Sequence, residues 1–106
     1  MEVHRNLGPG YLESVYENCL AKELTARNIK FERQEPLELI YKGEAMGKFQ
    51  PDILVEKKIV VEIKAVTHFV HAHEARAIHY LTATGMRLAL LLNLGTQKLG
   101  IKRIII

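Results

Sequence analysis

Hydrophobic residues in the first quarter of the chain recur at intervals of three and four positions. They are Leu12, Val15, Tyr16, Cys19, Leu20 and Leu24. This spacing predicts one helix that follows the Gly8-Pro9-Gly10 segment, has Pro9 in its first turn and runs to about Arg27. Asn28 is expected to cap this helix in a left-handed conformation.

The pattern then changes to the alternation that is typical of strands. From Phe31 to Tyr41 the alternation is interrupted by Pro36, which predicts either an edge strand or a kinked pair of strands. A second strand is expected over Gly47 to Val55. Ile59 to Val66 is rich in β-branched residues and predicts a central strand. Turns are expected at Lys42-Gly43 and at Glu56-Lys57-Lys58.

Helical periodicity returns between His71 and Thr84, with Ala75, Ile78 and Leu81 as the expected inward positions and Gly85 as the C-cap. Two further strands are expected, at Leu88–Leu94 and Ile101–Ile106. The predicted order is therefore helix, three strands, helix, two strands. This alternation predicts an α/β (α+β) fold, in which helices flank a mixed sheet.

The composition restricts the class of protein. The chain has 106 residues, which fits a single domain over residues 1–106, with 48% hydrophobic and 25% charged residues as in soluble globular proteins. A net charge of +3 permits a polyanionic partner without requiring one. No secretory segment opens the chain, and no apolar run approaches the ~20 residues that span a membrane. We expect a cytoplasmic protein.

Three charged residues on two neighbouring strands carry the candidate chemistry. Glu62 and Lys64 are two residues apart on a predicted strand, so their side chains share one face. Asp52 begins the preceding strand of an apparent hairpin and can lie beside Glu62. Mg²⁺, or Mn²⁺, binds hard carboxylate oxygens and retains waters, and a lysine ammonium can stabilise charge on phosphoryl oxygens. The set predicts a metal-dependent phosphodiester-cleaving site.

A simpler interpretation of the Glu-x-Lys pair is a solvated ion pair that contributes little. Two features favour the catalytic interpretation. Pro51-Asp52 lies upstream at the head of an adjacent strand, and apolar residues flank Glu62 and Lys64. An isolated pair of charges in a central strand would be costly without a function.

A longer motif carries a family resemblance. The segment Gly10-Tyr11-Leu12-Glu13-Ser14-Val15-Tyr16 resembles the signature of the GxxExxY proteins, a bacterial and archaeal family placed in the PD-(D/E)XK nuclease superfamily. The resemblance covers essentially the whole chain. It includes Val3 to Gly10, Tyr41-Lys42-Gly43, His73-Glu74-Ala75 and Tyr80-Leu81. It implies a restriction-endonuclease-like core.

The resemblance also implies roles for individual residues. Asp52 matches the principal metal ligand, and Glu62 and Lys64 match the E-x-K pair. Glu13 matches the helical glutamate that completes the acidic site, and the backbone carbonyl of Ile63 would be a further metal ligand. From the residues alone, Glu13 could equally be a solvated glutamate that the helix dipole stabilises.

Arg76 and Tyr80 lie four residues apart on one helix face and are the candidate nucleic-acid-binding residues. Their spacing resembles the Q-x-x-x-Y feature of RecB-like nucleases, although the family often has Gln where this chain has Arg76. An arginine can contact a phosphate well. The family usually has a helix upstream of Val3-His4, so the resemblance implies that this chain begins where that helix would be ending.

Four histidines, His68, His71, His73 and His79, lie on or just before the second predicted helix. A zinc site is one interpretation. His73 is not four residues from either His71 or His79, so we favour a polar helix face near the cleft, with His73 near its rim.

Two hypotheses from different classes follow. The first is a metal-dependent endo- or exonuclease that acts on nucleic acid, with DNA favoured and RNA as the alternative substrate. The second is a non-catalytic module that keeps the fold and binds nucleic acid or a protein partner. Specific DNA interfaces bury ~1,000–2,500 Å² of protein surface, which is large for this chain, so a homodimer is a possible assembly.

Overall fold

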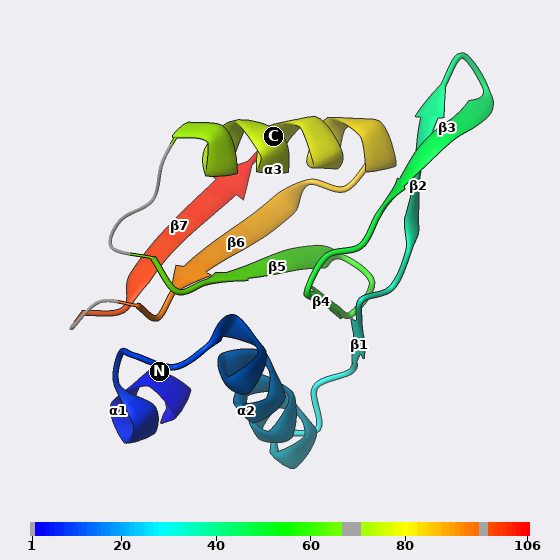
Figure 1. Ribbon diagram of the computed structural model, residues 1–106. Coiled ribbons are helices and arrows are strands. Elements are labelled where there is room, and N and C mark those ends of the chain that lie inside the picture. The colour runs from blue at the N-terminus through cyan, green and yellow to red at the C-terminus, as the bar shows by residue number, and fades with distance from the viewer. Residues whose placement is uncertain (1, 67–70, 96–97) are drawn as a thin grey trace.

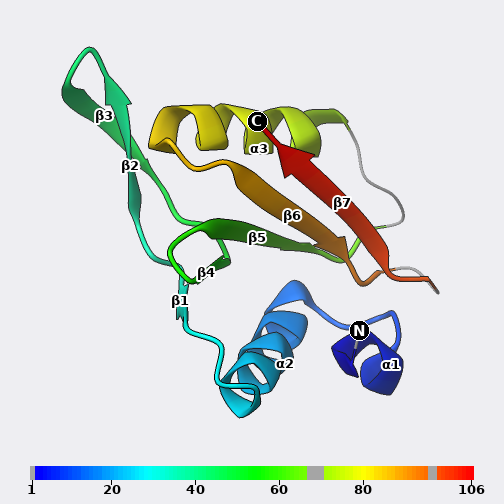
Figure 2. The ribbon, with the colours of Figure 1, turned by 180° about the vertical axis from the view of Figure 1, so that it is seen from behind.

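The structure is a computed structural model that describes residues 2–66, 71–95 and 98–106. It has three layers, with one helix on one face of a central sheet and two helices on the other (Figures 1 and 2). The helices are α1 (Glu2–Leu7), α2 (Glu13–Ala26) and α3 (His71–Thr84). α3 covers one face alone, whereas α1 and α2 share the other.

The central sheet has five strands in the order β1-β4-β5-β6-β7. These strands are β1 (Phe31–Arg33), β4 (Ile53–Val55), β5 (Ile59–Lys64), β6 (Leu88–Asn93) and β7 (Gly100–Ile105). β5 and β6 are parallel, and the other neighbours are antiparallel. A parallel pair needs a crossover connection, and α3 supplies it. The sheet is mixed and flanked by helices, as the sequence predicts.

Two hydrophobic clusters, one on each face, hold the layers together. Val60 belongs to the cluster under α3, together with Ala77 and Leu81. Val61 and Ile63 belong to the cluster under α1 and α2. Because side chains alternate along a strand, Glu62 and Lys64 project from β5 on the same side as Val60, toward α3. The alternation of β5 therefore decides on which face the candidate residues lie.

The order of elements differs from the predicted one. A short helix, α1, precedes α2. The segment Phe31–Tyr41 forms two strands, in agreement with one of its two expected alternatives, whereas the single strand expected over Gly47–Val55 is divided. Pro36 separates β1 from β2 (Leu37–Tyr41), and Pro51 separates β3 (Glu44–Phe49) from β4. Proline cannot donate a ladder hydrogen bond, so it ends a strand at these points.

The start of α2 also corrects the prediction. Pro9 does not lie in the first turn, because α2 begins at Glu13 with Leu12 as its N-cap. Gly8 and Gly10 have positive φ angles of 69° and 109°, so the chain turns here between two helices. This turn makes Glu13 the first residue of α2. The other end is as predicted, since Asn28 is left-handed with φ 57°.

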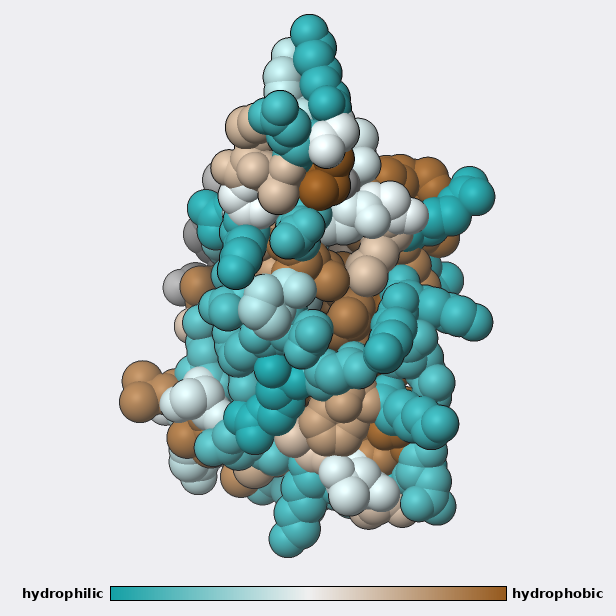
Figure 3. Space-filling model, turned by 90° about the vertical axis from the view of Figure 1, so that its right-hand side faces the viewer, coloured by the Kyte–Doolittle hydropathy of each residue, from teal (hydrophilic) through white to brown (hydrophobic). Residues whose placement is uncertain are grey.

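β2 and β3 pair only with each other and form a hairpin outside the central sheet. Its turn residues, Lys42 and Gly43, have φ angles of 49° and 82°, as two-residue hairpin turns require. The hairpin projects from the body of the molecule, and Figure 3 shows it as a narrow projection with a hydrophilic tip. Phe49 at its base is buried in the cluster under α3.

The buried face of α3 is displaced from the predicted one. Leu81 is buried as expected, but its partner on the helix is Ala77, whereas Ala75 and Ile78 are exposed. Ala77 and Leu81 are four residues apart and thus lie on one face of the helix. Gly85, with φ 77°, ends α3 as predicted.

Asn93, at the end of β6, is a buried polar residue with 2% of its surface exposed. Its side chain accepts hydrogen bonds from Val66 N (3.1 Å) and Gly95 N (3.0 Å) and donates one to Val66 O (2.9 Å). Gly95 packs directly against the backbone of Ala65 and Val66. A Cβ atom at Gly95 would be only 2.6 Å from the Ala65 carbonyl carbon. These contacts fix the chain just beyond β5, next to the candidate site.

Candidate active site

Asp52 and Glu62 face each other across the start of the β4–β5 pair. The register pairs Ile53 with Val61 and Leu54 with Val60, so the next position outward pairs Asp52 with Glu62. The backbone N–H of Asp52 donates to Glu62 Oε1 at 3.0 Å. The Glu62 side chain therefore lies beside the backbone of Asp52, at the point where β4 begins.

β5 extends beyond Ile53, the first residue of β4, and carboxylates accept hydrogen bonds from the backbone N–H groups that β4 does not reach. Ile63 N donates to Asp52 Oδ2 at 2.7 Å, and Ala65 N donates to Glu13 Oε2 at 3.0 Å. In a strand the N–H and C=O of one residue point to the same edge. The Ile63 carbonyl thus points to the edge along which Asp52 and Glu13 lie.

Burial and mutual repulsion raise the pKa of both facing carboxyls. Burial, followed by the negative charge of Asp52, raises the pKa of Glu62 to about 7. Burial also raises the pKa of Asp52; the charge of Glu17 adds to the increase, while the Ile63 N–H opposes it. Lys64 lowers both pKa values without offsetting the burial. Without a metal, the site therefore disfavours ionisation of both carboxyls, and a bound cation would favour it.

Lys64, Arg76 and Tyr80 lie together beside Glu62. The three side chains and Glu62 line one tight pocket between β5 and α3, with His73 at the same pocket. Arg76 is close enough to lower the pKa of Glu62. The ring of Tyr80 stacks on Phe49, with centroids 3.6 Å apart and planes at 12°. Positive charge and an aromatic ring thus flank the acidic pair.

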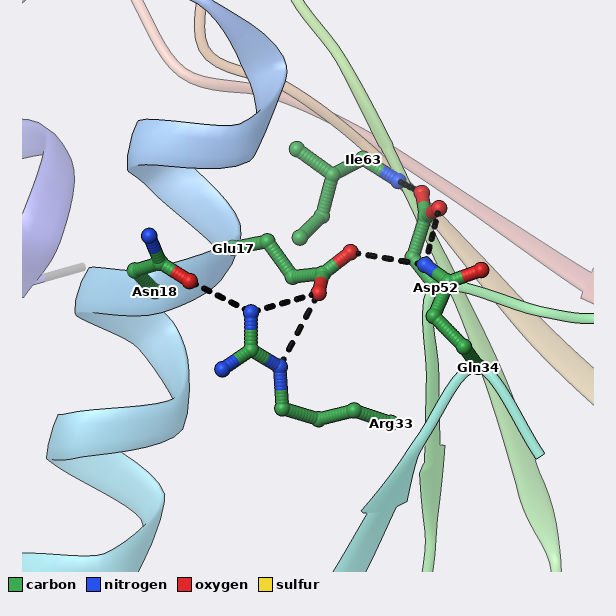
Figure 4. Close-up of polar contacts among 6 residues, drawn as sticks. All are labelled: Glu17, Asn18, Arg33, Gln34, Asp52 and Ile63. Atoms are coloured by element: carbon green, nitrogen blue, oxygen red, sulfur yellow. Dashed lines mark hydrogen bonds and ion pairs between the residues drawn. The ribbon is translucent and has the colours of Figure 1, made fainter.

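Two residues that the sequence analysis did not select are bonded to Asp52 or to its partners. Gln34, just after β1, donates from Nε2 to Asp52 Oδ1 at 3.4 Å and to Glu17 Oε1 at 3.0 Å (Figure 4). Glu17 also pairs with Arg33 at 2.7 Å. Glu17 lies four residues after Glu13 on α2, so the spacing could have suggested it. Gln34 gave no signal, because its role depends on a tertiary contact.

The donor set fits a hard divalent cation. Each facing carboxylate has one oxygen held by a backbone N–H, and Asp52 Oδ1 and Glu62 Oε2 are the oxygens that could bind a metal. Mg²⁺ and Mn²⁺ bind such oxygens with one or two carboxylates and several waters. Within residues 2–66, 71–95 and 98–106, no three His, Cys, Asp or Glu side chains form a group that could hold a metal together. The structure thus brings Asp52 and Glu62 together and places Glu13 farther along the edge.

Among the side chains that the structure describes, the histidines form no group that could hold a metal. His73 lies at the pocket beside Glu62, while His79 is exposed on α3. His68 lies outside the described residues, and so does the side chain of His71. A zinc site built from these residues stays an untested interpretation.

A larger cavity, of about 660 Å³, lies at the opposite end of β5. It is lined by the Glu56–Ile59 turn and by Gly85–Leu88, and Glu56 is its one acidic side chain. Cavity size alone would select this place. We assign the site to the Asp52–Glu62 pair instead, because two facing carboxylates beside an amine provide chemistry that the larger cavity lacks.

The sequence matches the PD-(D/E)XK nuclease superfamily over residues 1–104. The chain belongs to that superfamily. Members of this superfamily are generally dependent on divalent metals. The expected fold class is confirmed. The narrower assignment to the GxxExxY proteins stays a prediction.

The structure of this PD-(D/E)XK chain is also similar to a crystal structure of an alkaline exonuclease from Laribacter hongkongensis, with a TM-score of 0.52 and 14% sequence identity. The superposition covers 87% of this chain and 55% of that one, so this chain spans about half the length of that enzyme. At this identity the similarity supports the fold alone. A search of curated proteins found no match. None of the described helices is both long and apolar enough to cross a membrane.

Proposed function

We propose that this protein is a divalent-metal-dependent nuclease that hydrolyses phosphodiester bonds in DNA, with Mg²⁺ or Mn²⁺ as its cofactor. The observation that carries the proposal is the pairing of Asp52 with Glu62 across β4 and β5, with Lys64 on the same face. Burial and mutual repulsion oppose ionisation of this acidic pair, so the pair lowers the stability of the folded protein. A catalytic metal site would explain why it is present.

Each residue of the site has a distinct role in this proposal. Asp52 and Glu62 would hold the metal through one oxygen each, the Ile63 carbonyl would add a ligand, and Glu13 would act along the same edge. The metal, when bound, polarises the phosphate and favours ionisation of water. Lys64 would place its ammonium near the phosphoryl oxygens and stabilise the charge that develops there. No covalent nucleophile is required.

Arg76 and Tyr80 would bind the nucleic acid next to the scissile bond. Both line the pocket that Glu62 and Lys64 share, so a phosphate at the metal would lie within reach of α3. A guanidinium can bind phosphate through two hydrogen bonds, and an aromatic ring can stack on a base. Endo- and exonuclease action both remain compatible with this arrangement.

Substitutions of Lys64 and Asp52 test the proposal, because an ammonium does not ligate Mg²⁺ but a carboxylate does. Lys64→Ala should reduce the cleavage rate by roughly 100-fold or more while leaving metal affinity nearly unchanged. Asp52→Ala should weaken both. Cleavage of labelled single-stranded and duplex DNA with Mg²⁺, Mn²⁺ or chelator measures the rate, and calorimetry measures metal affinity. Lys22→Ala, on an exposed position of α2, is the matched control.

The second candidate is the non-catalytic module. It would be preferred if the wild-type protein bound nucleic acid but cut none with any divalent metal, and Lys64→Ala changed nothing. If it bound only another protein, both nucleic-acid interpretations would be wrong. A homodimer and a cytoplasmic location stay predictions from the sequence.

A further inference from the structure

Gln34 joins two carboxylates that repel each other. Its amide nitrogen donates to Glu17 Oε1 at 3.0 Å and to Asp52 Oδ1 at 3.4 Å (Figure 4). A glutamine amide has two N–H donors, so one side chain can serve both acids. The proposed function uses Asp52 but gives Gln34 no role.

The backbone of Gln34 is bound to the same residue as its side chain. Gln34 N donates to the carbonyl oxygen of Asp52 at 3.2 Å. Gln34 also has a positive φ angle of 53°, a left-handed conformation that residues other than Gly, Asn and Asp seldom adopt. Such conformations persist where the surroundings determine them and occur often at functional sites. The local conformation thus aims the side chain at Asp52 and α2.

Glu17 is anchored from its other side. Arg33 donates from Nε and Nη2 to Glu17 Oε2, at 3.0 and 2.7 Å, and its Nη2 also bonds Asn18 Oδ1. Both oxygens of Glu17 are thus engaged, one by Arg33 and one by Gln34. The Glu17 side chain is only 13% exposed. This makes Glu17 a fixed anchor for Gln34.

Each oxygen of Asp52 therefore accepts a hydrogen bond from a different segment of the chain. Ile63 N holds Oδ2 from β5, and Gln34 holds Oδ1 from the end of β1. Each carboxylate oxygen can accept more than one interaction, so a cation could still bind. Resting on the proposed nuclease function, we propose that Gln34 is a positioning residue that orients the Asp52 carboxylate for divalent-metal binding. The Glu17–Arg33 pair keeps Gln34 in place.

Two substitutions separate the amide from the backbone. Gln34→Gly suits the left-handed conformation and removes the side chain, and Gln34→Met keeps the length without a donor. In calorimetry with Mg²⁺ or Mn²⁺ and no nucleic acid, both should raise the dissociation constant roughly tenfold, the size found when a residue that orients a metal ligand is lost. In cleavage assays at a fixed low metal concentration, kcat should fall and KM for DNA should change less than about twofold. Gln34→Gly should keep the wild-type melting temperature without metal or exceed it.

Asn28→Gly is the matched control, since Asn28 is also left-handed, with φ 57°, but lies outside the site, in the turn after α2. It should leave the dissociation constant unchanged. As a single substitution, Glu17→Leu should weaken metal binding. In the double variant with Gln34→Gly it should add little, because both substitutions break the same chain of contacts. Additive effects would make Glu17 an independent ligand and overturn the inference.

The result for wild-type protein separates this inference from the function on which it rests. If the wild type binds divalent metal and both Gln34 variants bind it equally well, the inference alone is overturned. If the wild type binds no divalent metal and cuts no nucleic acid, the proposed function is overturned together with it.

Discussion

At the scale of single residues, the buried acidic pair makes the metal-free protein sensitive to pH. Glu62 has its pKa raised from 4.5 to about 7, and that of Asp52 is raised in the same direction. A raised pKa in the folded state means that folding favours the protonated form. The stability that this provides is fully present below about pH 4.5 and is lost as the pH rises through about 7.

Glu62→Gln should remove the part of this pH dependence that comes from Glu62. At pH 8 without metal, the variant should be more stable than wild type by roughly 1–3 kcal/mol, because it carries no buried charge. Asp52→Asn should keep or raise the melting temperature for the same reason. Thermal unfolding between pH 4.5 and 8 measures the effect, with Glu38→Gln, at an exposed position of β2, as the control. A loss of stability in Glu62→Gln at pH 8 would contradict the assignment.

The sequence could predict those site residues whose relative positions follow from one strand or from one short hairpin. Glu62 and Lys64 share a face by alternation, and Asp52 opposes Glu62 because a short turn joins their strands. Gln34 could not be predicted, because its contacts require β1 to lie beside β4 and α2 to lie beside both. Those contacts are set by tertiary packing and leave no periodic signal.

At the scale of elements, the loop after β5 depends on one buried amide. Asn93→Ala would leave Val66 N and O and Gly95 N without their side-chain partner, and each buried polar group without a partner costs about 1–3 kcal/mol. We expect a loss of roughly 2–4 kcal/mol in the free energy of unfolding, since some groups will find water. Denaturant unfolding measures this loss. Asn6→Ala, an exposed asparagine on α1, should change it by less than about 0.5 kcal/mol.

The elements were predicted best where side-chain periodicity is strong. β5, α3 and the end of α2 agree with the predicted ranges to within one or two residues, whereas α2 starts at Glu13 and not near Pro9. The strand expected over Gly47 to Val55 did not agree, because its apolar pattern continues past Pro51 while the hydrogen-bond ladder cannot. The pattern of side chains therefore locates faces well, but the backbone donors decide where a strand ends.

At the scale of the whole molecule, the net charge is modest. Individual cationic side chains near the site should therefore dominate binding to a polyanion. The net charge is +3, and Arg76 lies at the acidic site. If Arg76 contacts a phosphate, Arg76→Ala should make the slope of log affinity against log salt shallower by about one. Arg27→Ala removes the same charge at the far end of α2 and should leave the slope nearly unchanged. Fluorescence titrations of labelled DNA at several salt concentrations, with Ca²⁺ to limit cleavage, give the slopes.

The layered arrangement also shows which features of the overall architecture could be predicted from the sequence. Alternating helices and strands predicted a mixed sheet between helices, and the superfamily match agrees. The pairing of β2 with β3 outside that sheet was not predicted. Its residues alternate like those of any strand, and only the positions of the neighbouring strands decide whether a hairpin joins a sheet or leaves it.

The free edge of β5 has a consequence for how the site can be observed. The amide protons of Ile63 and Ala65 are held by carboxylates, Asp52 and Glu13, instead of by a neighbouring strand. Exchange of amide protons inside a sheet needs the strands to separate, whereas these two need only a side chain to rotate. The rates at which these two amide protons exchange with deuterium, and their NMR chemical shifts, should therefore change when the Asp52 and Glu13 carboxylates are protonated or bind a metal. The amides of Ile63 and Ala65 therefore report directly on the acidic edge, and no probe has to be attached to the protein.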